Sequence, residues 1–174
     1  MILDFDNFIN EGKQRGDLYH LTTIISLLKI IDSNTLGDVS LGKYATVSLT
    51  RNKNFYKETK IIPNECYLTI DGDKLSTKYK IKPYQWHKNH FFNKKTDNTS
   101  SIEDQYEEEV QGYIKNIKRY VKEIIIFDID LDPIIFDDDY APQIGEILNM
   151  KYDEIRHIDI INWIKSKGYK LKII

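Results

Sequence analysis

The chain is poor in several features, and each shortage excludes a class of protein. Among its 174 residues stands a single cysteine, Cys66, so neither an internal disulfide nor a cysteine-based metal cage can form within it. No apolar run reaches the about 20 residues that a membrane-spanning helix needs. The N-terminus also lacks the basic and then apolar pattern of a secretory signal. These features favour a reducing cytoplasm.

An excess of charge of one sign is lacking as well. The 25 basic and 27 acidic residues give a formal net charge of −2, so no global basic field draws the protein onto nucleic acid. Hydrophobic residues make up 41% of the chain and charged residues 30%, as in an ordinary globular protein. The chain contains no repeats and no linker long enough to separate domains, so we expect a single domain at residues 17–174.

Two patterns fall short of a metal site. Asp71-Gly72-Asp73 resembles the start of a calcium loop, but the glutamate that completes such a loop does not follow at the right spacing, so we expect a turn here. His87 and His90 lie in a polar and aromatic stretch that supplies no further zinc ligands. The sequence therefore predicts no bound metal.

Residues 18–36 give the clearest structural pattern. They open with a short β-prone run, and Thr22 or Thr23 then caps a helix that Asn34 ends. The apolar residues of this helix recur at the spacing of one buried face: Ile24, Leu27, Leu28 and Ile31. His20 thus stands at the end of a buried strand, just before a helix. It is either a core residue bonded to a carbonyl or part of a site.

A second half-buried strand is predicted at residues 44–51. Two apolar residues alternate with polar ones there, which puts Ser48 and Thr50 together on the other face. Arg51 follows at the strand end. An arginine in this place is either solvated or able to bind a phosphate or carboxylate through two parallel hydrogen bonds.

The acidic run IEDQYEEEV precedes a clear strand at residues 120–127. Such a run is normally a solvated face. Because a strand follows it closely, however, we expect the run to lie near the sheet and not in a tail. In an extended conformation Gln105, Glu107 and Glu109 share one side, and Glu108 faces away.

The remaining elements decide the fold class. They are a strand at 65–70, a short helix-like piece at 114–119, helices at 143–150 and 154–167, and a closing strand at 169–174. The last helix carries an apolar stripe that includes Ile155, Ile158, Ile161 and Ile164. Strands rival helices in number and follow one another without regular crossover helices. This pattern favours an α+β fold over a doubly wound α/β fold.

Four pieces of this sequence stand in one order: Tyr19-His20-Leu21-Thr22, Ser48-Leu49-Thr50-Arg51, Gln105-Tyr106-Glu107 and the strand at 124–127. This order resembles the ADP-ribosyltransferase superfamily, in particular its DarT-like and phage-encoded members, over residues 17–127. The resemblance implies a split, mixed or antiparallel sheet flanked by helices. It also implies that NAD is bound as a substrate.

The resemblance further implies a role for each matching residue. Glu107 stabilises the positive charge that develops on the nicotinamide-side ribose and draws a proton from the acceptor, with Glu109 as the alternative on the same face. Gln105 orients the acceptor. His20 binds the adenosine-side ribose, and Arg51 binds a phosphate of NAD. The implied NAD-binding set is completed by Tyr19, Thr22, Ser48 and Thr50.

Two further segments have a place in this interpretation. The polar and aromatic loop at residues 82–101 serves as a lid, and its lysines and rings suit a nucleic-acid base, a single strand or a protein surface. Residues 1–16 form either a docked helix or a targeting peptide. The string from Phe5 to Gly12 resembles the head-targeting peptides of T-even-like phages, whose maturation protease cuts after a Leu/Ile-x-Glu triplet such as Ile9-Asn10-Glu11.

The expected activity is mono-ADP-ribosylation of a host macromolecule, either DNA, RNA or protein, by a phage-encoded and toxin-like monomer that binds no membrane. We expect it in the host cytoplasm after packaging in the phage head. Two alternatives stay open: a non-catalytic binding or virion-packaged structural protein that kept the fold, and an NAD glycohydrolase that transfers ADP-ribose to water.

Overall fold

The strand that carries His20 lies near the middle of a seven-stranded sheet in the computed structural model, which describes residues 16–53, 65–83, 107–127 and 139–174. The strand order is β5-β6-β3-β1-β4-β8-β9. The bounds are β1 (Asp17–Thr22), β3 (Thr46–Thr50), β4 (Cys66–Asp71), β5 (Ile81–Pro83), β6 (Glu107–Gln111), β8 (Val121–Ile126) and β9 (Leu171–Ile173). All neighbours pair antiparallel except β8 and β9, which are parallel. The predicted α+β class is confirmed.

Helix α2 (Ile24–Ser33) forms where its capping residues predict. The hydroxyl of Thr23 accepts a hydrogen bond from the backbone N–H of Ser26 at 3.3 Å, which satisfies one of the free donors of the first turn. Asn34 ends the helix in the left-handed conformation, with φ of 50°. The apolar face between these caps is buried, as the spacing predicted.

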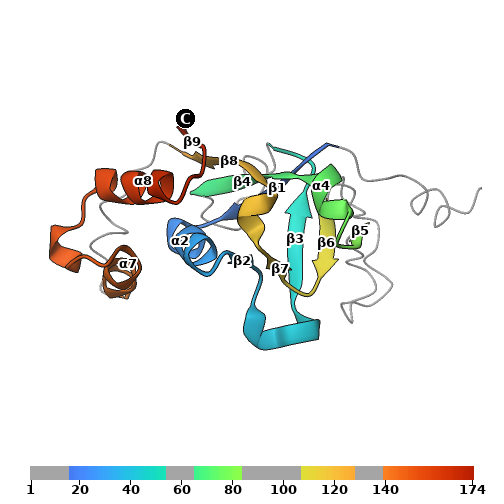
Figure 1. Ribbon diagram of the computed structural model, residues 1–174, viewed down its shortest axis with the longest axis horizontal. Coiled ribbons are helices and arrows are strands. Elements are labelled where there is room, and N and C mark those ends of the chain that lie inside the picture. Colours follow the sequence, from blue (N-terminus) through green and yellow to red (C-terminus); the bar gives the residue numbers. More distant parts are fainter. Residues whose placement is uncertain (1–15, 54–64, 84–106, 128–138) are drawn as a thin grey trace, which may run out of the picture.

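One hydrophobic core joins the helices to the sheet. Apolar residues of α2, α7 (Ala141–Leu148) and α8 (His157–Ser166) form a single buried cluster with the inward residues of β1, β3, β4, β6 and β8. Figure 1 shows the three helices gathered toward the β9 side of the sheet, while β3, β6 and β5 extend away from them. A two-stranded sheet of β2 (Thr35–Leu36) and β7 (Ile114–Lys115) adds Leu36 and Ile114 to the same core.

The pleat divides the strand residues between two faces. Residues that pair directly across antiparallel strands point to the same side, and neighbours along a strand point to opposite sides. Leu18, Leu49 and Leu68 are buried on the side of the core. Tyr19, Thr50 and Thr69 belong to the other side, because Tyr19 pairs with both threonines. We call these sides the core face and the outer face.

The sheet is split between β1 and β3. Within the described parts of these two strands a single residue pair, Tyr19 with Thr50, joins them. The flanking strands are joined over much longer stretches, with six pairs between β1 and β4 and five between β3 and β6. The sheet therefore consists of two well-paired parts that meet along a short contact.

One expectation about local structure is wrong, and two are confirmed only in part. Asp71-Gly72-Asp73 is not a free turn, because Asp71 caps the short helix α4 (Gly72–Ser76) by accepting from Lys74 N at 3.0 Å. The piece expected to be helical at 114–119 begins instead as β7 and ends in a 3-10 turn at Ile117–Arg119. The last helix starts at His157, after a separate 3-10 turn at Tyr152–Glu154.

Candidate functional site

The three strands that carry the predicted site residues are immediate neighbours. The order β6-β3-β1 brings the acidic strand beside the Ser48 strand, and the Ser48 strand beside the His20 strand. These residues are far apart in the sequence, and the antiparallel pairing unites them. In cross-section, β1 and β6 lie about 10 Å apart, since each strand spacing is about 4.8 Å.

His20 occupies the split between β1 and β3. Its Nδ1 atom lies 2.9 Å from the carbonyl oxygen of Ser48. A carbonyl oxygen only accepts, so Nδ1 carries the proton and Nε2 of the neutral ring presents a lone pair. Burial lowers the pKa of His20 below its ordinary value of 6.5, and the hydrogen bond to Ser48 partly opposes that decrease. Within the described residues Nε2 has no hydrogen-bond partner, so it is available to a hydroxyl donor.

Glu108 forms the second polar feature. It is 6% exposed and is the one charged residue among the buried side chains of the described segments. Its Oε1 accepts a hydrogen bond from Nε of Arg51 at 2.6 Å, and the Arg51 side chain stays 46% exposed. The other carboxylate oxygen of Glu108 and the two terminal nitrogens of Arg51 make no hydrogen bond within the described residues. Arg51 is therefore paired with Glu108 and is not merely solvated.

The strand register separates His20 from the favoured glutamate position. Position 107 pairs with Thr50, which in turn pairs with Tyr19, so this row belongs to the outer face. Glu109 pairs with Ser48 on the same face. His20 belongs to the core face, because it pairs with the buried Leu68 of β4. His20 and position 107 therefore belong to opposite faces of the sheet.

Glu108 shares the core face with His20. It pairs with the buried Leu49 and precedes the buried Val110 by two positions. The sequence predicted correctly that Glu108 faces away from Glu109, but the position of Glu108 on the core face was not predicted. Val110 is the signal that could have found this, because an apolar residue two positions on marks the core side of a strand.

The other predicted residues differ in their surroundings. The ring of Tyr19 meets that of Tyr67 edge-on, with centroids 5.6 Å apart, and burial raises the pKa of Tyr19, with Asp17 adding to the increase. Thr22 is buried, and its carbonyl accepts from the thiol of Cys66. The hydroxyl of Thr50 accepts from the N–H of Asn52. Gln105 and most of the predicted lid lie outside the described residues.

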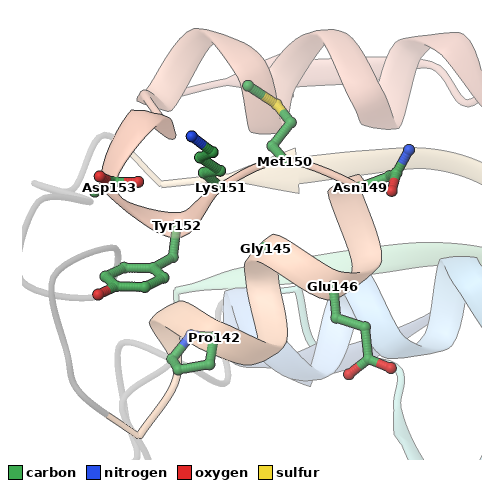
Figure 2. A pocket seen from close by; sticks show the side chains of 8 residues that line it. All are labelled: Pro142, Gly145, Glu146, Asn149, Met150, Lys151, Tyr152 and Asp153. Atoms are coloured by element: carbon green, nitrogen blue, oxygen red, sulfur yellow. The ribbon is translucent and has the colours of Figure 1, made fainter.

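Two hollows in the described part of the surface lie away from these strands. One, of about 700 Å³, is formed by α7 and the 3-10 turn after it, and Figure 2 shows Pro142, Glu146, Met150 and Tyr152 around it. A smaller one of about 410 Å³ lies between α2 and α7. Neither is lined by His20 or by the acidic strand.

The described segments lack two kinds of feature. They contain no group of three or more histidine, cysteine, aspartate or glutamate side chains that could hold a metal ion. They also contain no helix that is both long and apolar enough to span a bilayer.

The comparisons with known proteins add no family to this picture. No family model matches the sequence, and no curated protein matches it significantly.

Proposed function

We propose that the protein is an NAD-dependent mono-ADP-ribosyltransferase that modifies a host macromolecule. The observation that carries the proposal is the strand order β6-β3-β1, which makes neighbours of the strands that carry His20, Ser48 and position 107. The order of the motifs along the chain is a weak signal. The adjacency of the three strands in one sheet is an independent property of the fold. A fold alone does not fix an activity, so the side chains along these strands must also suit the reaction.

The polar groups beside the split match the chemistry of NAD. Nε2 of His20 is able to accept a hydrogen bond from a ribose hydroxyl, because the proton of the ring is held on Nδ1 by Ser48. Arg51 offers its terminal guanidinium nitrogens to a phosphate. The acidic strand supplies a carboxylate for the other ribose. A hydroxyl acceptor, a cation and a carboxylate are the three groups that a dinucleotide with a departing nicotinamide requires.

The reaction proceeds at C1 of the nicotinamide-side ribose. The bond from C1 to the nicotinamide nitrogen breaks, and nicotinamide leaves with the bonding electron pair. The carboxylate stabilises the positive charge that spreads over C1 and the ring oxygen. A nucleophilic oxygen or nitrogen of the acceptor then forms the new bond to C1 with its lone pair. Its proton passes to the carboxylate or to solvent.

The acceptor is a host macromolecule, DNA, RNA or protein, and the protein acts in the host cytoplasm after delivery from a phage head. The segment that would reach such an acceptor is the predicted aromatic loop, which lies outside the described residues. If water replaces the macromolecule, the same chemistry becomes NAD hydrolysis.

The direct test uses NAD labelled in its adenosine half. Wild-type protein and the His20→Gln variant are each incubated with labelled NAD and a bacterial lysate, and label in protein, RNA and DNA fractions is counted separately. We expect label in one fraction with the wild-type protein and a strong decrease with the variant. The proposal would be contradicted if the wild-type protein neither transferred label nor released nicotinamide.

The second candidate is a non-catalytic binding or virion-packaged structural protein with the same fold. It is favoured by the position of the two described hollows, which lie on α7 and not at the split. Calorimetry separates the two functions, because a binding protein of this kind gives no heat with NAD and releases no nicotinamide.

A further inference from the structure

The register of the acidic strand distinguishes its three glutamates, although they are consecutive in the sequence. Glu109 pairs with Ser48 and position 107 with Thr50, both on the outer face. Glu108 pairs with Leu49 on the core face, where His20 also lies. A pleated strand does not permit all three to serve one site.

The surroundings of Glu108 are unlike those of a solvated acidic run. Its side chain is buried on the side of the core, and a charge in such a place is retained only with a partner. The partner is Arg51, which contacts one carboxylate oxygen through Nε alone. This single contact fixes the carboxylate while its second oxygen makes no hydrogen bond in the described part of the chain.

The same contact also fixes the arginine. Nε is engaged by Glu108, and the two terminal nitrogens of Arg51 make no hydrogen bond in the described part of the chain, on a side chain that is half exposed. An anion that binds there meets a cation whose orientation is already set, so less side-chain entropy is lost on binding.

We infer that Glu108, and not Glu107 or Glu109, is the carboxylate that acts together with His20, and that it also positions Arg51 for a phosphate. This inference rests on the proposed function and assigns its carboxylate. The geometry points to a ligand that combines a ribose hydroxyl for Nε2 of His20, an electron-poor ribose carbon for Glu108 and a phosphate for Arg51.

In the proposed step Glu108 stabilises the charge at C1 as the bond to nicotinamide breaks, and the leaving nicotinamide keeps the electron pair. The incoming acceptor atom forms the new bond, and its proton is taken by the Glu108 carboxylate before release to solvent. No oxidant, reductant or metal ion takes part.

The experiment compares Glu108→Gln with Glu107→Gln and Glu109→Gln in the full chain. Release of nicotinamide from NAD is measured with and without lysate, and far-ultraviolet circular dichroism checks the fold of each variant. Glu123→Gln, at a partly buried position in β8 of the same sheet, is the matched control that keeps wild-type turnover. We expect Glu108→Gln to lose turnover by on the order of 100-fold or more, as for loss of a charge-stabilising or proton-accepting group.

A second readout separates action on the reaction from a merely structural role. Glu108→Gln should lower kcat and also raise the KM for NAD, because Arg51 loses its orientation. Arg51→Gln should raise KM more than it lowers kcat. Glu107→Gln and Glu109→Gln should change either constant by much less.

The outcomes are distinct for the inference and for the proposed function. A folded Glu108→Gln variant with wild-type turnover, or a Glu107→Gln or Glu109→Gln variant that loses turnover as severely as expected for Glu108→Gln, overturns the inference and leaves the function standing. Wild-type protein that neither releases nicotinamide nor transfers label overturns the function itself. If Glu108→Gln does not fold, retained turnover in both neighbouring variants supports the assignment to Glu108.

Discussion

Nδ1 of His20 donates a hydrogen bond to the carbonyl oxygen of Ser48 at 2.9 Å, at the point where β1 and β3 separate. The backbone of β3 lacks its usual partner on β1 beyond the Tyr19 pair, and the imidazole satisfies one of its acceptors instead. The His20 side chain therefore supplies a hydrogen bond that a neighbouring strand would otherwise make, and its Nε2 is also a candidate acceptor for a hydroxyl. Protonation at Nε2 removes the acceptor for a hydroxyl, whereas the Nδ1 proton stays bonded to the Ser48 carbonyl.

We expect the stability of the protein to fall as the pH decreases below about 6.5, in part because of His20. The pKa of His20 is lowered in the folded state, chiefly by burial, so the unfolded chain binds the proton first. The free energy of unfolding is therefore greatest above the ordinary histidine pKa and declines as the pH falls through the folded pKa. Urea unfolding of wild-type protein and His20→Gln between about pH 7.5 and about pH 5.5 measures the difference. Equal loss of stability in both proteins would contradict this expectation.

Arg51 and Glu108 should be energetically coupled. Removing either partner by Arg51→Gln or Glu108→Gln should cost about 1 to 3 kcal/mol, less than for a fully buried pair because half of the Arg51 side chain stays in water. The double variant should cost less than the sum of the two, since the second change removes a group that is already unpaired. A double-mutant cycle by urea unfolding measures the coupling. Additive losses would show that the contact does not persist in solution.

Gly37→Ala should destabilise the protein by about 1 to 3 kcal/mol. The residue has a φ of +98°, and an added Cβ would lie 2.8 Å from Cγ2 of Val47. Gly112→Ala is the matched control, because its φ is +89° but the new Cβ would have no heavy atom within 4 Å. Thermal unfolding should rank the control between wild type and Gly37→Ala. The reverse order would mean that the close approach to Val47 relaxes at little cost.

Thr23→Ala should lower the free energy of unfolding by about 1 kcal/mol through loss of the N-cap of α2. Thr23→Ser keeps the hydroxyl that accepts from Ser26 N and should retain most of that stability. Urea unfolding of the three proteins tests the cap. A Thr23→Ser variant as unstable as Thr23→Ala would assign the effect to the lost methyl group instead.

Local structure was largely readable from the sequence, because it depends on neighbours along the chain. Thr23 and Asn34 bound α2 as predicted, since a capping hydroxyl and an asparagine in the left-handed region act within one helical turn. The apolar stripe of the last helix was less reliable. Ile160 and Ile164 are buried, but Ile158 is 47% exposed, so the buried face of this helix is the one that carries Ile160 and Ile164.

The arrangement of the site was harder to predict, because it depends on residues far apart in sequence. Arg51 and Glu108 are separated by 57 positions, and nothing in either segment indicates that they form a pair. Three consecutive glutamates carry no alternation of their own, so the phase of β6 had to come from Val110. A shift of one residue exchanges the two faces of a strand. Glu107 was favoured from the sequence because Gln105 precedes it by two residues, whereas the register places Glu108 on the core face.

The narrow link between β1 and β3 has a mechanical consequence. The two well-paired parts of the sheet, β5-β6-β3 and β1-β4-β8-β9, meet at one residue pair. Separating the two parts breaks few backbone hydrogen bonds, whereas opening either part breaks a whole series of them. Amide protons within β4 and β8 should therefore exchange with solvent more slowly than those of β3 that face β1. Within the described residues the shortest pairing of this sheet lies in its interior, between β1 and β3, and not along an edge.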